Sequence, residues 1–230
     1  MDWQLAHAPA ASPARAARSD TQRLDKWGVT QATARHWDYR VRVMPDGTGQ
    51  HLAIYKDEKG VPCFVKVRKV SPDNPKLGFF GVGDQSAVTL WGAEKWGAGG
   101  PMVVVCEGEK DTLHGSQLWN CKFPVVGLPF GAESSGKAFA KAIDKLARYE
   151  KVVRALDMDR PGREGAEQLA AMLPPGKAYI AEFPTKDLAD TVAAGGPEAA
   201  KRALFNAAPY RPDGIVDADE MDAKLLEPIT

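Results

Sequence analysis

The stretch MVVVCEGEKD, residues 102–111, decides the fold class. Four apolar residues and a cysteine have the length and the β-branched content of a buried strand. Three acidic side chains, Glu107, Glu109 and Asp111, follow this segment directly. Ligands of open parallel sheets bind outside the carboxyl ends of the strands, so acids at this position indicate a functional site.

The chain after the glycine-rich segment GAGG (97–100) alternates between apolar, strand-like segments and amphipathic, helix-like ones. The expected strands are residues 102–106, 124–129, 151–159 and 178–184. The expected helices are residues 111–119, 137–149, 163–173 and 187–195. Repeated strand–helix units of this length predict an α/β fold with a mostly parallel sheet flanked by helices.

The chain before GAGG has a different pattern. Thr30 is placed to cap a short helix that leads into a strand near residues 39–44, and residues 51–70 have the alternation of a β-hairpin around the turn KDEKG. We therefore expect a flexible linker at 1–24, a small basic α+β domain at 25–97 and an α/β catalytic domain at 98–212. Residues 213–230 have the composition of the start of a linker helix.

Composition excludes several classes of protein. Lys plus Arg and Asp plus Glu are 30 each, but residues 1–100 hold 14 basic and 10 acidic side chains, which predicts a basic surface opposite an acidic site. The three cysteines have no metal-binding or disulfide spacing, which favours a reducing cytoplasm. No apolar run reaches the roughly 20 residues of a membrane span, so no membrane partner is expected.

Acidic residues follow three of the expected strands. Glu107 follows the first, Asp157 and Asp159 lie on one side of the third because they are two residues apart, and Asp187 follows the fourth. Clustered carboxylates repel one another unless a cation lies between them. Oxygen ligands without His or Cys favour Mg²⁺ or Mn²⁺, and Mg²⁺ in such sites is usually shared with substrate phosphates.

Basic residues lie in the N-terminal hairpin. Lys66 and Arg68 share one face of the second strand, Lys69 lies on the other face, and Lys76 follows in a loop. This pattern fits either a phosphate-binding surface or an edge strand protected by charge. The segment GAESSGKA (131–138) resembles a phosphate-binding loop, but Ala138 replaces the hydroxyl that would hold Mg²⁺, so Lys137 and nearby amides are left as possible phosphate contacts.

The acidic motifs resemble a known family. E-G-x-x-D after a strand, D-x-D with the following Gly162, and a third acid are similar to the TOPRIM fold of primases, topoisomerases, some nucleases and recombination mediators. Several longer segments between residues 28 and 217 resemble the primase half of the primase-helicases of short-tailed bacteriophages. They are LWGAEKWGAGGPMVVVCEGEKDTL, PVVGLPFGA, DMDRPGREGAEQLAAMLPPGK, KDLAD and PYRPDGIV.

The resemblance implies a DNA primase that makes short RNA primers from ribonucleoside triphosphates on single-stranded DNA. It implies Glu107, Asp157 and Lys66 as catalytic residues, with Lys66 as the lysine that faces the incoming nucleotide. The implied metal ligands are Glu107, Asp157, Asp159 and Asp187. Family members also carry a zinc-binding module and a hexameric helicase domain, which are therefore the implied partners. We expect this chain, which matches neither, to be a fragment or a short form that acts in the cytoplasm of a bacterial host.

Two alternatives remain open at this point. A TOPRIM nuclease would use the same acids to hydrolyse DNA. A non-priming domain would bind DNA and support assembly of a replicative helicase. The acids and the KVR segment (66–68) favour the primase.

Overall fold

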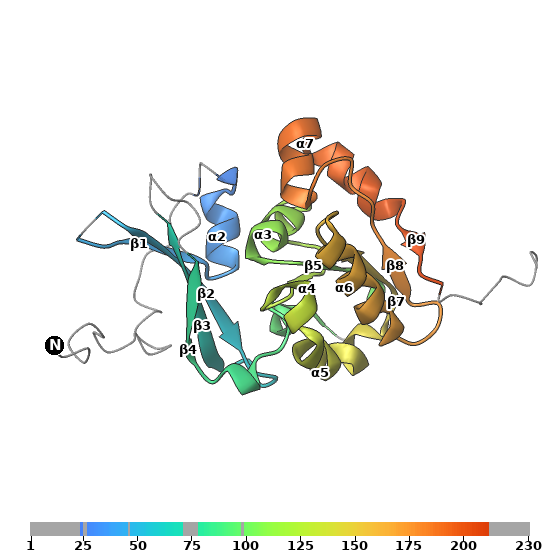
Figure 1. Ribbon diagram of the computed structural model, residues 1–230, viewed down its shortest axis with the longest axis horizontal. Coiled ribbons are helices and arrows are strands. Elements are labelled where there is room, and N and C mark those ends of the chain that lie inside the picture. The colour runs from blue at the N-terminus through green and yellow to red at the C-terminus, as the bar shows by residue number, and fades with distance from the viewer. Residues whose placement is uncertain (1–23, 25–26, 46, 71–77, 98, 212–230) are drawn as a thin grey trace, which may run out of the picture.

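The computed structural model describes residues 24, 27–45, 47–70, 78–97 and 99–211. They form two lobes, each built on its own sheet (Figure 1). The N-terminal lobe contains residues up to 97, and the α/β lobe contains residues 99–211. The expected linker at 1–24 lies almost entirely outside the described residues, and Lys76 and the segment 213–230 lie fully outside them.

The N-terminal lobe is an antiparallel sheet with one capping helix. The helix is α2 (Gln31–His36), and the strands, in sheet order, are β1 (Arg40–Val43), β2 (Gly49–Lys56), β3 (Pro62–Val70) and β4 (Phe79–Gly83). Thr30 caps α2 as predicted, because its hydroxyl accepts a hydrogen bond from the backbone N–H of Thr33 at 3.2 Å. The predicted hairpin is also confirmed, as β2 and β3. Two short turns, η3 (Gln85–Ala87) and η4 (Ala93–Lys95), lead to the α/β lobe.

The α/β lobe has a five-stranded sheet in the order β6-β5-β7-β8-β9. Its strands are β5 (Gly100–Cys106), β6 (Val125–Gly127), β7 (Tyr149–Ala155), β8 (Ala178–Ile180) and β9 (Ala208–Pro209). The first four pair in parallel, as the sequence predicts, and β9 adds an antiparallel edge. This order puts β5 and β7 side by side, so the acids that follow them meet at one edge of the sheet.

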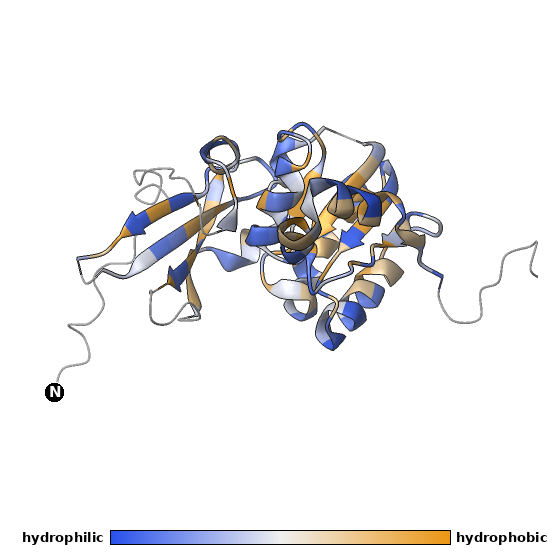
Figure 2. Cartoon of the chain, turned by 90° about the horizontal axis from the view of Figure 1, so that it is seen from above, coloured by the Kyte–Doolittle hydropathy of each residue, from blue (hydrophilic) through white to orange (hydrophobic). Residues whose placement is uncertain are grey.

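Helices cover both faces of this sheet (Figure 1). They are α3 (Glu109–Gln117), α4 (Gly131–Ser134), α5 (Gly136–Leu146), α6 (Arg160–Ala171) and α7 (Leu188–Phe205). One core includes Phe139 of α5 and Leu169 of α6, and the core on the opposite face includes Leu188 and Leu204 of α7. Hydrophobic residues accordingly concentrate on the strands inside this lobe (Figure 2).

Two details of the helices differ from the expectation. The segment that resembles a phosphate-binding loop forms the short helix α4 and the start of α5, separated by the buried Ser135. Helix α7 continues beyond the expected residue 195 to Phe205, with a kink at Gly196, whose φ is +74°, followed by Pro197. Glycine adopts this left-handed conformation without the strain that a side chain would bring.

The two lobes share a hydrophobic cluster and several polar contacts. Trp37, Tyr55 and Trp91 pack with Leu113 of α3, and Trp91 also exchanges two backbone hydrogen bonds with Gly127 of β6. The Trp91 indole donates to the carbonyl of Ile54 in β2 at 3.0 Å. These contacts hold the antiparallel sheet against the α/β lobe. In the part of the chain that the structure describes, no helix is both long and apolar enough to cross a membrane.

Candidate active site

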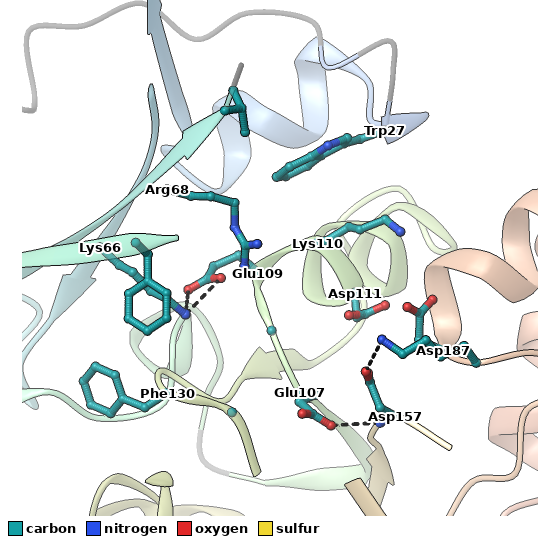
Figure 3. A pocket seen from close by; sticks show the side chains of 15 residues that line it. Trp27, Lys66, Arg68, Glu107, Glu109, Lys110, Asp111, Phe130, Asp157 and Asp187 are labelled. Carbon is teal, nitrogen blue, oxygen red and sulfur yellow. Dashed lines mark hydrogen bonds and ion pairs between the residues drawn. The ribbon is translucent and has the colours of Figure 1, made fainter. Parts of the chain in front are cut away.

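A pocket with a volume of about 590 Å³ lies between the lobes. Lys66, Arg68, Trp27 and Phe79 come from the N-terminal lobe, and the α/β lobe contributes all of the acidic side chains together with Lys110, Lys186 and Phe130 (Figure 3). The residues that line it are Trp27, Lys66, Arg68, Val70, Phe79, Glu107, Gly108, Glu109, Lys110, Asp111, Phe130, Gly131, Asp157, Lys186 and Asp187. All acidic side chains of the cavity therefore lie on the α/β wall, with Lys66 and Arg68 on the opposite wall.

Three aspartates form the acidic centre of the pocket. Asp111 lies in the first turn of α3, Asp157 follows β7, and Asp187 is the N-cap of α7. Each offers a carboxylate oxygen within 4.8 Å of the other two, and Asp111 and Asp187 are buried. An all-oxygen set at this separation has the ligand type and the charge that bind a divalent cation.

The electrostatics of this cluster point to a cation as well. Burial, and after it the neighbouring Asp187 carboxylate, raise the pKa of Asp111 to about 7, although a hydrogen bond from the N–H of Ala189 at 3.1 Å opposes this shift. Burial also raises the pKa of Asp157, although Lys186 opposes this shift with its ammonium 2.9 Å from the Asp157 carboxylate. Without a bound ion, the cluster therefore carries repulsion that is only partly offset.

Glu107 and Asp159 lie beside the three aspartates. Glu107 lines the pocket and accepts a hydrogen bond from the backbone N–H of Asp157 at 2.9 Å, and burial raises its pKa. Asp159 is exposed and caps α6 by accepting from the N–H of Gly162 at 3.0 Å. Both stay predicted metal ligands. Of the predicted set, Asp157 and Asp187 belong to the group whose oxygens lie within 4.8 Å of one another.

A buried ion pair connects the two lobes on the basic side of the pocket. Lys66 of β3 places its ammonium 3.0 Å from a carboxylate oxygen of Glu109 and donates to the carbonyl of Pro129 at 2.9 Å. The Tyr55 hydroxyl donates to Glu109 at 2.5 Å. Lys66 and Glu109 are 6% and 5% exposed, so each charge depends on the other for compensation. Figure 3 shows this pair facing the cavity.

The other basic residues that the sequence singles out lie in different places. Arg68 is exposed and lines the pocket, on the same face of β3 as Lys66. Lys69 is on the opposite face, where its ammonium lies 5.4 Å from the centre of the Phe80 ring. Lys137 is exposed on α5 and does not line the pocket. A nucleotide or DNA contact by Arg68, Lys69 or Lys137 stays a prediction.

Sequence reasoning missed several residues of the site. Asp111 is the last residue of the motif E-G-x-x-D. The feature that marks it is an acidic side chain on a helix whose other residues on that face are buried. Lys186 directly precedes Asp187 and is the cation nearest to Asp157. Tyr55 gives no local signal, because its contact with Glu109 joins residues that are 54 positions apart.

Comparison with known proteins identifies the class of this fold and pocket. A model of the Toprim-like family matches residues 104–192, which include all three aspartates. The "DNA helicase/primase" of Enterobacteria phage T3 is 30% identical over 230 aligned residues, which cover 94% of this chain and 40% of the T3 protein. The chain thus spans about two-fifths of that relative.

Solved structures give the same result. The primase fragment of the bacteriophage T7 primase-helicase is 30% identical, with a TM-score of 0.71, over 80% of this chain and 74% of the fragment. T7 primase domains bound to an RNA/DNA hybrid and dTTP, in a complex with the lagging-strand DNA polymerase, are 31% identical with a TM-score of 0.73, over 83% of this chain and 94% of that one. The fold is therefore of the TOPRIM type. The chain belongs to the family of primase domains found in phage primase-helicases.

Proposed function

We propose that this chain joins ribonucleoside triphosphates into short RNA primers on a single-stranded DNA template. The observation that carries the proposal is one cavity with three clustered aspartates on one wall and Lys66 with Arg68 on the other. Carboxylate side chains hold a divalent cation and basic side chains hold phosphates. Phosphoryl transfer requires both kinds of side chain in one place. Membership of the phage primase family supports this reading.

The protein's own residues have separate tasks in this reaction. Asp111, Asp157 and Asp187 hold the ion, with Glu107 and Asp159 assisting, and Mg²⁺ or Mn²⁺ is the ion we propose. When bound, the ion would activate the 3′-hydroxyl of the growing chain and neutralise the triphosphate. Lys66 and Arg68 orient the triphosphate for in-line attack with loss of pyrophosphate, and no covalent enzyme intermediate is needed.

The donor set fits such an ion. All candidate ligands are carboxylates, and the raised pKa of about 7 for Asp111 reflects burial and a neighbouring anion that a cation would offset. Lys186 is 58% exposed on its side chain, so it can leave Asp157 when the ion binds. These features favour a site that is completed by metal over a permanent ion pair.

We further propose that single-stranded DNA contacts the N-terminal lobe mainly through its phosphates. Such contacts carry little base information and weaken with salt. A hexameric helicase domain is a further partner that we propose, because the T3 and T7 relatives are helicase-primases. A zinc-binding module is proposed from the resemblance of the sequence motifs alone.

A primer-synthesis assay tests the proposal. The chain is incubated with single-stranded DNA, labelled ribonucleotides and Mg²⁺ or Mn²⁺, and oligoribonucleotides are resolved by length. Asp157→Ala should reduce synthesis to background, whereas Asp144→Ala, an exposed acid on α5, should not change it. Metal-dependent degradation of the DNA without ribonucleotides, and no primer product, would show a nuclease instead.

A further inference from the structure

An exposed aromatic ring lies among the cations of the pocket. Phe79 is the first residue of β4, pairs directly with Arg68 of β3, and lies within reach of Lys66, whose ammonium is 4.7 Å from the ring centre. Its neighbour Phe80 points to the opposite face of the sheet. The face of β3 and β4 that lines the pocket therefore carries two cations, Lys66 and Arg68, and an aromatic ring.

The exposure of this ring is unusual for its position. In the part of the chain that the structure describes, the large hydrophobic residues with exposed side chains are Val43, Val61, Phe79, Phe80 and Phe205. Of these, Phe79 alone lines the pocket, and it is 57% exposed there. A ring that buries so little of itself contributes little to the core, so core packing does not account for an aromatic residue at this position.

We propose that Phe79 is a stacking platform for a nucleobase. This rests on the proposed function and adds to it a contact with the base, since the acids and Lys66 account only for metal and phosphate. Bases stack on aromatic rings regardless of their sequence, and a cation next to the ring adds to such sites. The base belongs either to the incoming ribonucleotide or to the template strand, and the same chemistry serves both.

The position on an edge strand supports this role. Strand β4 pairs on one side with β3 and is the last strand of its sheet, so among the residues that the structure describes no strand flanks Phe79 on its other side. Lys66 is held in place by Glu109 and Pro129, so the cation that contacts the ring is fixed before any ligand arrives. The Phe79 ring therefore has one fixed cationic neighbour, and more than half of its surface is exposed. Such a ring is better suited to stacking on a base than to packing in a hydrophobic core.

Equilibrium binding to the full chain tests the proposal without requiring catalysis. ATP with Mg²⁺ is titrated by calorimetry, single-stranded DNA by fluorescence anisotropy at constant salt, and inorganic tripolyphosphate serves as the ligand without a base. The variants are Phe79→Ala, Phe79→Leu and Phe79→Trp, and the matched control is Phe80→Ala, because Phe80 is also exposed and lies over a lysine on the opposite face. Thermal unfolding verifies that each variant folds.

We expect Phe79→Ala to weaken the binding of ATP, of DNA or of both by roughly 5- to 100-fold, the range of a lost base–aromatic stack. Phe79→Trp should bind like the unmodified chain, Phe79→Leu should resemble Phe79→Ala, and tripolyphosphate binding should not change. Loss of ATP binding alone identifies the incoming nucleotide, and loss of DNA binding alone identifies the template.

Three results would overturn the inference: unchanged binding by Phe79→Ala, equal binding by Phe79→Leu and the unmodified chain, or an equal loss in Phe80→Ala. An equal loss of tripolyphosphate binding would also overturn it, because the ring would then act through Lys66. Failure of primer synthesis together with an effect of Phe79→Ala on ATP or DNA would refute the proposed reaction and leave the stacking site standing.

Discussion

Replacing Asp111 by asparagine should stabilise the protein in the absence of metal, although it removes a proposed metal ligand. The pKa of Asp111 is raised from 3.8 to about 7, mainly by burial. At about 1.4 kcal/mol per pKa unit, ionising this group inside the fold costs roughly 4 kcal/mol at pH 8. Asparagine has nearly the same shape and can still accept the hydrogen bond from Ala189, but it carries no charge.

The sign of the pH dependence follows from the direction of the shift. Because the folded protein holds this proton more tightly than the unfolded chain does, the contribution of Asp111 to the free energy of unfolding is greatest at low pH. It declines as pH rises from about 4, the usual Asp pKa, toward 7. The asparagine variant does not lose this contribution. The difference in free energy of unfolding between the variant and the unmodified protein should therefore grow in favour of the variant by roughly 2–3 kcal/mol between pH 5 and pH 8. The raised pKa of Glu107 and Asp157 remains in both proteins.

Urea denaturation in EDTA at pH 5 and pH 8 measures this difference, with Asp144→Asn as an exposed acidic control. Adding Mg²⁺ at pH 8 should stabilise the unmodified protein, by about 2.7 kcal/mol at 100 times the dissociation constant, and should stabilise the variant less. The reasoning is refuted if the advantage of Asp111→Asn is the same at both pH values, or if the variant is the less stable protein at pH 8.

Three further substitutions test other parts of the site. Lys66→Ala leaves Glu109 buried without its cation, so the free energy of unfolding should fall by about 3–5 kcal/mol and the nucleotide KM should rise. An unchanged denaturation curve would show that Glu109 does not depend on Lys66 for compensation of its charge. In Gly162→Ala the new Cβ would lie 2.2 Å from the carbonyl oxygen of Asp157, so the main chain must move and calorimetry should show weaker Mg²⁺ binding, whereas equal affinity would refute this. Asp159→Asn keeps an N-cap and should change stability by less than about 0.5 kcal/mol while lowering metal affinity; unaltered affinity would leave Asp159 a cap only.

The parts of the fold that sequence patterns predict are those that depend on local periodicity. The strand–helix alternation after residue 100 and the hairpin of β2 and β3 were found because apolar residues repeat with the period of each element. Strand β4 was not found, since FFGVG has two exposed phenylalanines and two glycines and owes its conformation to pairing with β3. The two-residue β9 was missed for the same reason, because only its pairing with β8 defines it.

The acidic site was predictable to a similar degree. Asp157 and Asp187 were found because carboxyl ends of parallel strands meet at one edge, a property of topology that the sequence pattern already implies. Asp111 was noted among the acids of this segment but was not assigned as a metal ligand, because it lies on a helix and not at a strand end. The Tyr55–Glu109–Lys66 contact depends on how the lobes dock, and no periodicity within either lobe carries that information.

The separation of the acids along the chain has a consequence for folding rates. Asp111 accepts a hydrogen bond from a residue 78 positions away, and the cluster is complete only after β5, β7 and β8 have been brought together by crossovers. Contacts of such long range form late, since loop closure must precede them. A cation bound by the finished cluster would then stabilise the native state much more than the folding transition state. Added Mg²⁺ should therefore slow unfolding and leave the refolding rate nearly unchanged in stopped-flow measurements; faster refolding would place the cluster in the folding nucleus.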